Sequence, residues 1–181
     1  MYFRNQLGNI LIITSLAIIV FIYYPLWQLV FPLSLPGNLS AISGEYILIP
    51  KIYAWAPLIE NVNPANESQY MKALSEGVAV AQGSAVIGTP GNIFLFAHSS
   101  EEPWLITRYN VAFLKLGQLK SGDEVILGKN FRQYHYRVTG SKVVSPTEVA
   151  YLNHPVAPLT LMTCTPIGTA WKRLLVFAQP E

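Results

Sequence analysis

The pattern of hydrophobic residues divides the chain into one long apolar segment near the N-terminus and several short apolar runs after it. Residues 7–31 are nearly all apolar, and no charged residue occurs from Asn5 to Gly44. A helix needs about 20 apolar residues to cross a bilayer, so this segment predicts a membrane anchor. The short runs that follow are separated by Gly, Pro, Asn and Ser, a pattern that predicts a domain made mainly of β-strands.

These segments predict three parts of the chain. Residues 1–31 form a cytoplasmic tip and a transmembrane anchor, residues 32–44 form a linker rich in Pro, Gly and Ser, and residues 45–181 form the globular domain. Arg4 and the N-terminal amine precede the apolar segment, and positive charge there orients the N-terminus into the cytoplasm, with the domain extracytoplasmic. A cleaved signal peptide is the alternative, but the apolar run is longer than the core of such peptides.

The domain is expected to contain many short elements joined by turns. Pro50 places the first strand at a sheet edge or at a bulge. A short helix is expected over Asn66–Glu76, where Gly77 ends it, and another over residues 110–119. Strands are expected over residues 46–52, 56–62, 84–87, 93–97, 124–128, 133–144, 159–163 and 174–177, with an extended segment at 77–80 and a loop at 145–158.

Composition narrows the possible functions. Only 12% of the residues are charged and 51% are hydrophobic, which agrees with a membrane segment. The formal net charge is +2, which is too small and too dispersed to indicate nucleic acid or another polyanion as the partner. Cys164 is the single cysteine, so the chain contains no internal disulfide. An unpaired thiol in an exported protein is either buried and inert or kept for chemistry.

The candidate chemistry lies where predicted strands end. Cys164 follows the apolar run 159–163, and Lys172 and Arg173 precede the run 174–177. If these two strands are neighbours, a thiol and a cation can face one cleft, an arrangement that suits acyl transfer. Side chains alternate along a strand, so only one of the two cations can face that cleft.

The best-placed histidine also ends a predicted strand. His98 follows the continuous apolar run 93–97, which is typical of a buried central strand. His135 lies in a strand on its solvated face, and His154 lies in a loop between prolines. A single cysteine and three scattered histidines show none of the close-spaced pairs typical of a zinc site, so no metal site is expected.

The segment Thr160–Cys164, with the sequence Thr-Leu-Met-Thr-Cys, resembles the TLxTC signature of sortases, the membrane-anchored cysteine transpeptidases of bacterial surfaces. Arg173 stands nine positions later and matches the arginine of short-loop members, which selects it over Lys172. The segment Gly91–His98 resembles the family segment that ends in a histidine. Ala97 and Ser99 depart from the glycine and arginine that many relatives have beside that histidine, and the similarity covers residues 46–178.

The resemblance implies a mainly β fold, an eight-stranded β-barrel with short helices, and a transpeptidase activity. Cys164 would cleave an LPxTG-like sorting signal through a thioester, and His98 would transfer protons. Arg173 would hold the substrate or the oxyanion, and Thr163 would help to order the site. The implied partners are surface proteins that carry the signal and an acceptor amine, such as a cell-wall precursor or a pilin lysine.

No cofactor is expected, although some sortases use calcium. Glu60, Glu67 and Glu148 are too dispersed to predict a calcium site, so calcium dependence stays open. An L,D-transpeptidase is one alternative, but its cysteine follows Ser-x-Gly close behind the histidine, whereas His98 and Cys164 are far apart. The other alternative is a non-catalytic, membrane-anchored β-domain that binds a surface partner and buries Cys164.

Overall fold

The strands of the domain close into a single barrel. The computed structural model describes residues 2–30, 44–100, 109, 111–148 and 157–181. Within these residues the order of strands around the barrel is β1-β2-β3-β4-β7-β8-β6-β5, and β5 pairs with β1. The bounds are β1 Tyr46–Ile49, β2 Ala54–Val62, β3 Val78–Ala81, β4 Ile93–Phe96, β5 Glu124–Lys129, β6 Arg132–Val144, β7 Leu159–Thr165 and β8 Lys172–Pro180. The predicted eight-stranded barrel is confirmed.

Two of the strand pairings are parallel, and one of them joins distant parts of the chain. β2 pairs with β3 in parallel, and β4 pairs with β7 in parallel, with Ile93 opposite Leu159 and Phe96 opposite Met162. The other pairs are antiparallel. Because β4 lies between β3 and β7, it is covered on both edges, as its continuous apolar run predicts.

The barrel interior is filled by the apolar side chains of the strands. β6 alternates as predicted, since Tyr136 and Val138 are buried while His135 and Thr139 are exposed. Burial of each large aliphatic or aromatic side chain contributes about 1.5–3 kcal/mol to folding. The largest fully buried side chains are Phe113, Ile47, Ile49, Ile93, Leu95, Leu116, Leu127, Leu159, Leu161, Leu175, Val62 and Val78.

One helix in the described part of the chain packs against β2 and β3. Helix α2 (Glu67–Glu76) begins after Asn66, whose side-chain oxygen accepts a hydrogen bond from the backbone N–H of Gln69 at 3.2 Å. It ends at Gly77, as predicted. A Cβ at Gly77 would lie 2.3 Å from the carbonyl oxygen of Pro57, so glycine is required where the chain enters β3.

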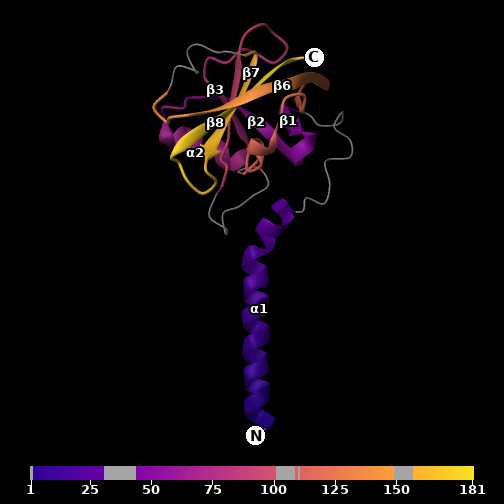
Figure 1. Ribbon diagram of the computed structural model, residues 1–181, viewed down its shortest axis with the longest axis vertical. Helices are drawn as coiled ribbons and strands as arrows, with labels where there is room; N and C mark the ends of the chain where they lie inside the picture. The colour runs from indigo at the N-terminus through magenta and orange to yellow at the C-terminus, as the bar shows by residue number, and fades with distance from the viewer. Residues whose placement is uncertain (1, 31–43, 101–108, 110, 149–156) are drawn as a thin grey trace.

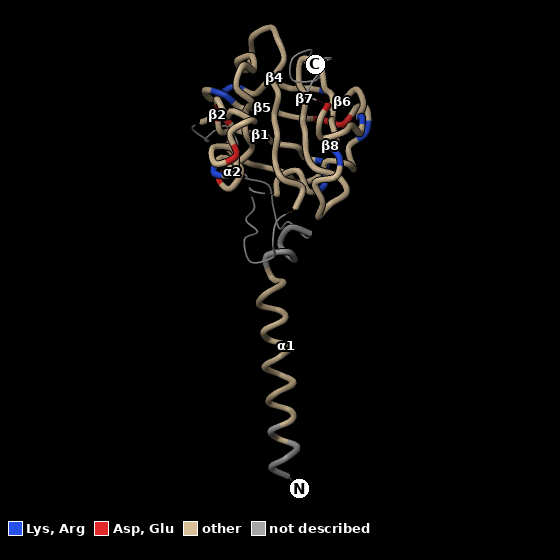
Figure 2. Tube along the Cα trace, turned by 90° about the vertical axis from the view of Figure 1, so that its left-hand side faces the viewer, with Lys and Arg blue, Asp and Glu red and all other residues tan. Residues whose placement is uncertain are grey.

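The N-terminal helix α1 (Tyr2–Val30) lies outside the barrel (Figure 1). Its side chains are described at residue 6 and over residues 8–24, and the large apolar ones between Ile10 and Tyr24 are exposed. Figure 2 shows the charged residues on the barrel and none on this described part of α1. Among the residues that the structure describes, no helix combines the length and apolarity that a membrane crossing requires. The three-part division of the chain stays a prediction.

The predicted first strand is too long. β1 ends at Ile49, and Pro50 begins the short 3-10 helix η2 (Pro50–Ile52), because its fixed φ suits a first helical turn. β1 is also not an edge strand, since it pairs with both β2 and β5. The prediction of an edge or a bulge at Pro50 is therefore wrong.

Two other predicted elements are also wrong. Residues 84–87 form no strand, because Ser84 closes a turn with Ala81 and its hydroxyl accepts a hydrogen bond from the backbone N–H of Phe94. Residues 111–119 hold turns and the 3-10 helix η3 (Leu116–Gln118) in place of the predicted helix. Phe113 and Leu116 are fully buried there, a spacing that three-residue turns satisfy.

Candidate active site

The strand pair β7–β8 places the thiol beside the arginine. Cys164 lies directly opposite Arg173 in the antiparallel register, and Thr165 lies opposite Lys172. Directly opposite residues of an antiparallel pair point to the same face, so Cys164 and Arg173 share a face and Lys172 points to the other. Lys172 is exposed. β7 runs past Cys164 to Thr165, two residues longer than predicted, because pairing with β8 continues.

β4 brings His98 to the same end of the barrel. The backbone N–H of Ala97 donates to the carbonyl of Met162 at 3.2 Å, which extends the parallel pairing of β4 and β7 by one step. The hydroxyl of Thr163 donates to the carbonyl of Ala97 at 2.8 Å, and Thr163 is buried. The residues that directly precede Cys164 and His98 are therefore hydrogen-bonded to each other.

The loop between β7 and β8 is tied to the other side of His98. The backbone N–H of Gly168 donates to the hydroxyl of Ser100 at 2.9 Å. Gly168 has φ +82°, a left-handed conformation that favours glycine. His98 therefore lies between Ala97 and Ser100, each of which is hydrogen-bonded to the segment that carries Cys164.

One cleft of about 550 Å³ is lined by Cys164, His98 and Arg173. The structure thus brings together the cysteine, histidine and arginine that the sequence singles out. Side chains of α2 and of the first residues after β6 form the far walls. The lining residues are Pro64, Tyr70, Met71, Leu74, Phe94, Phe96, Ala97, His98, Ser99, Ser100, Val144, Ser145, Pro146, Glu148, Met162, Thr163, Cys164, Gly168, Thr169, Ala170, Arg173 and Leu175.

Arg173 is held at the rim of the cleft by its own loop. Its Nη1 donates to the carbonyl of Ala170 at 3.0 Å and to that of Lys172 at 3.3 Å. These bonds fix one side of the planar guanidinium, so the group is oriented before a substrate arrives. Such preorganised donors are what a developing oxyanion requires.

Ser99 also belongs to the site. The sequence indicated it only as a departure from the family pattern. It borders the cleft, it is 2% exposed, and its hydroxyl has no hydrogen-bond partner in the described part of the chain. Buried polar groups are nearly always paired, which makes this hydroxyl unusual. A serine directly after the candidate histidine was the available signal.

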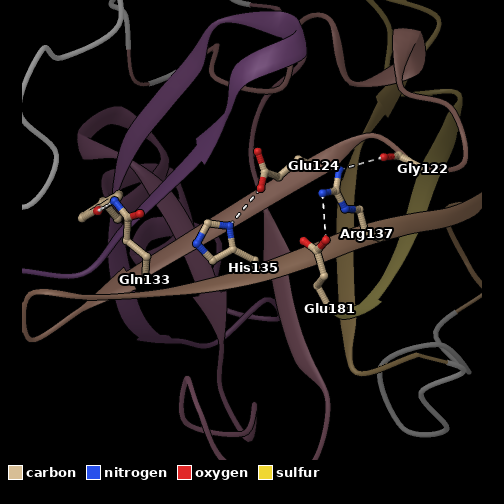
Figure 3. A network of polar contacts seen from close by, with 7 residues as sticks. Gly122, Glu124, Gln133, His135, Arg137 and Glu181 are labelled. Atoms are coloured by element: carbon tan, nitrogen blue, oxygen red, sulfur yellow. Dashed lines mark hydrogen bonds and ion pairs between the residues drawn. The ribbon is translucent and has the colours of Figure 1, made fainter.

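Of the other two histidines, only His135 belongs to the part of the chain that the structure describes, and it does not line this cleft. His154 lies outside the described residues. His135 lies on the exposed face of β6, where its Nδ1 is 2.9 Å from Oε1 of Glu124 on β5 (Figure 3). Glu124, His135 and Glu181 offer ligand atoms within 4.8 Å of one another, a grouping that spacing in the sequence did not indicate. Glu60, Glu67 and Glu148 form no such group among the described residues.

This second group is organised by an ion pair. Arg137 donates to Oε1 of Glu181 at 2.9 Å (Figure 3). That hydrogen bond lowers the pKa of the Glu181 carboxyl and raises the pKa of the Arg137 guanidinium. The backbone N–H of Glu181 also donates to the carbonyl of His135 at 3.0 Å, so the C-terminal end of the chain is attached to β6.

The fold and the cleft define a class of protein, a β-barrel with a cysteine, a histidine and an arginine at one end. The family model of the sortase domain matches residues 47–181 of this chain. The chain belongs to the sortase family.

Two curated relatives are similar over only part of their length. The chain is 31% identical to Sortase A of Bacillus anthracis over 114 residues, which is 62% of this chain and 51% of the relative. It is 26% identical to Sortase D of Bacillus subtilis (strain 168) over 136 residues, which is 72% of this chain and 60% of the relative. The chain thus spans between half and two thirds of these relatives.

Solved structures show the same architecture. Sortase C-1 from Actinomyces oris matches with a TM-score of 0.62 at 27% identity, covering 76% of this chain and 73% of that one. A lid mutant of Sortase A from Corynebacterium diphtheriae matches with a TM-score of 0.60 at 26% identity, covering 77% and 70%. These matches bear out the predicted family and the barrel, and they leave the sortase class open.

Proposed function

We propose that this protein is a cysteine transpeptidase that cleaves an LPxTG-like sorting signal and transfers the acyl group to an amine on the cell surface. The observation that carries the proposal is the shared cleft, in which Cys164 lies opposite Arg173 and next to the strand end that bears His98. The partners are then surface proteins with the signal and an acceptor such as a cell-wall precursor or a pilin lysine.

The first half of the reaction forms a thioester. The sulfur of Cys164 attacks the carbonyl carbon of the scissile peptide bond, and a C–S bond forms as the C–N bond breaks. His98 takes the proton of the Cys164 thiol and gives it to the leaving amine. Arg173 donates hydrogen bonds to the oxygen on which negative charge develops, and its anchored guanidinium requires little reorganisation at that moment.

The second half of the reaction forms a new amide. An amine attacks the thioester carbonyl carbon, the C–N bond forms and the C–S bond breaks, and His98 accepts the proton that the amine loses. The proton then returns to the sulfur of Cys164. Thr163 acts through its hydrogen bond to Ala97, which holds the histidine segment against the cysteine strand.

Intact-protein mass spectrometry tests this function. Incubation with a peptide that contains an LPxTG-like signal is expected to add the mass of the acyl fragment to the protein, and an added amine is expected to remove it as an amide. Cys164→Ala is expected to abolish both steps. His135→Ala changes the group of Glu124, His135 and Glu181, which lies outside the cleft, and this control variant is expected to react normally.

Two results would contradict the proposal. Amide exchange by Cys164→Ala would exclude covalent catalysis by this thiol. Absence of any acyl-enzyme with a library of sorting-signal peptides, together with slow labelling of Cys164 by a small thiol reagent, would favour the non-catalytic binding domain.

We also propose that α1 anchors the domain in the cytoplasmic membrane with the N-terminus inside. Its exposed apolar side chains over residues 10–24 and the position of Arg4 support this orientation. Protease added to intact cells is expected to degrade the barrel once any outer wall is removed. Protection until the cytoplasmic membrane is lysed would reverse the orientation.

A further inference from the structure

The loop between β7 and β8, residues 166–171, presents two large apolar side chains to solvent. Ile167 is 62% exposed and Trp171 is 74% exposed. The loop contains no acidic residue, and the exposed Lys172 follows it. Figure 1 shows this loop at the end of the barrel that faces α1. Large apolar side chains that are exposed together mark sites of contact with another protein or with a membrane.

Hydrogen bonds fix the loop in the conformation that exposes these side chains. The backbone N–H of Thr169 donates to the carbonyl of Pro166 at 3.0 Å and closes a β-turn, with Ile167 at its outer corner. Gly168 in the same turn is hydrogen-bonded to Ser100 at 2.9 Å. The loop is therefore ordered in the unbound protein, so that binding a partner through it costs little conformational entropy.

The chain between α1 and the barrel limits how far this loop can lie from the membrane that α1 is proposed to cross. Residues 31–43 span at most about 45 Å, at about 3.5 Å per residue. A domain of this size has a radius of gyration of about 14 Å, so every face of the barrel can reach the bilayer. Because a tether keeps the effective concentration high, even a weak surface contact is populated.

Tryptophan is the side chain best suited to such a contact. Its ring is mostly apolar but carries one N–H, and it favours the headgroup region of a bilayer. Lys172, directly after Trp171, points away from the face that Cys164 and Arg173 share. Its ammonium group can therefore stay among the headgroups while Arg173 stays in the cleft.

We propose that the β7–β8 loop docks on the surface of the membrane that holds α1, with Trp171 at the level of the headgroups and Ile167 at the boundary of the acyl chains. This inference rests on the anchoring by α1 proposed above. Docking orients the barrel, because the same loop forms part of the rim of the main cleft. The cleft then opens at the membrane surface.

Tryptophan fluorescence of the full-length protein in vesicles tests the docking. The vesicles contain phosphatidylcholine and phosphatidylglycerol, either unmodified or brominated on the acyl chains near the headgroups. The emission of Trp171 is the difference between the unchanged chain and Trp171→Phe, in which the other three tryptophans, Trp27, Trp55 and Trp104, cancel. We expect this emission to lie at shorter wavelength than that of indole in water and to be quenched by bromine. Emission as in water, without quenching, would overturn the inference.

Ile167→Ser tests whether the whole loop takes part. Burial of an isoleucine side chain favours the docked state about tenfold or more, so we expect this variant to lose most of the quenching of Trp171. Phe131→Ser is the matched control, because Phe131 is 67% exposed but precedes β6, whose other end borders the cleft. Its quenching is expected to equal that of the unchanged chain. Equal losses in both variants would indicate unspecific adsorption and would overturn the assignment to this loop.

Contact of Trp171 with the sorting-signal peptide is the competing explanation for its exposure. Trp171→Ala would then raise KM for a soluble peptide in detergent, and Trp171 would show no quenching in vesicles; that combination would overturn the membrane contact. The fluorescence measurement needs no catalysis, so failure of the proposed transpeptidation is seen separately, as the absence of an acyl-enzyme mass. Protein that does not float with the vesicles on a density gradient would overturn the anchoring, and this inference with it.

Discussion

The hydrogen bond from Thr163 to Ala97 offers the sharpest test of how the site is held together. Thr163→Val keeps the branched shape of the side chain but removes the hydroxyl that donates to the Ala97 carbonyl at 2.8 Å. Because Thr163 is only 4% exposed, water does not easily replace the lost donor. Leaving a buried carbonyl unsatisfied costs about 1–3 kcal/mol of unfolding free energy.

That loss can be measured as a shift in melting temperature. For a chain of 181 residues, a loss of 1 kcal/mol lowers Tm by about 2–4 °C. The same change loosens the attachment of His98 to the cysteine strand, and displacement of about 1 Å can cost up to about a hundredfold in rate. We therefore expect kcat for acyl transfer to fall about tenfold or more.

The assay compares three proteins, the unchanged chain, Thr163→Val and Thr163→Ser, in detergent, by thermal melting and by kcat on one sorting-signal peptide. Thr163→Ser retains the hydroxyl and is expected to keep most of the activity. If Thr163→Val melted and turned over like the unchanged chain, the bond to Ala97 would not order the site. Equal damage by both substitutions would assign the effect to packing.

Two further predictions concern charges. Arg173→Lys loses the planar guanidinium and is expected to reduce kcat by about a hundred- to a thousandfold, which is the effect of losing one oxyanion donor. Lys172→Ala, on the opposite face of β8, is expected to change kcat little. The reverse pattern would show that Lys172, and not Arg173, is the cation of the site. Because Arg137 lowers the pKa of Glu181, this ion pair adds stability above about pH 4.3, and the stability is lost as pH falls through the lower folded pKa. Glu181→Gln should therefore flatten the Tm–pH curve slightly below pH 4, and an unchanged curve would contradict the pairing.

Several strands could be predicted because their apolar runs alone are enough to indicate a buried strand. β4 and β7 begin where the sequence predicts, and β8 contains the predicted run, so the location of Cys164 and His98 at one end of the barrel follows from residue pattern. The ends of strands are less predictable. Thr165 and Lys172 are polar, and only their pairing with each other keeps them in the ladder.

Some features were missed because they depend on contacts that the local sequence does not contain. Residues 85–87 are apolar, as in a strand, but Ser84 closes a turn with Ala81 and its hydroxyl is hydrogen-bonded to Phe94. Ser99 and Ser100 were not predicted to take part in the site because their surroundings come from elsewhere in the chain. Ser100 accepts its hydrogen bond from Gly168, 68 positions away.

The register between β4 and β7 explains why polar residues matter at a site surrounded by apolar strands. β4 is apolar on both faces, so alternation of side chains does not specify which of its residues faces which residue of β7. A slip of one residue would turn His98 to the opposite face from its partners. Two polar contacts select the observed register: Asn92 donates to the hydroxyl of Thr160 at the start of the pair, and Thr163 donates to Ala97 at its end. The geometry of the candidate site therefore depends on a few hydrogen bonds that exclude the alternative alignments.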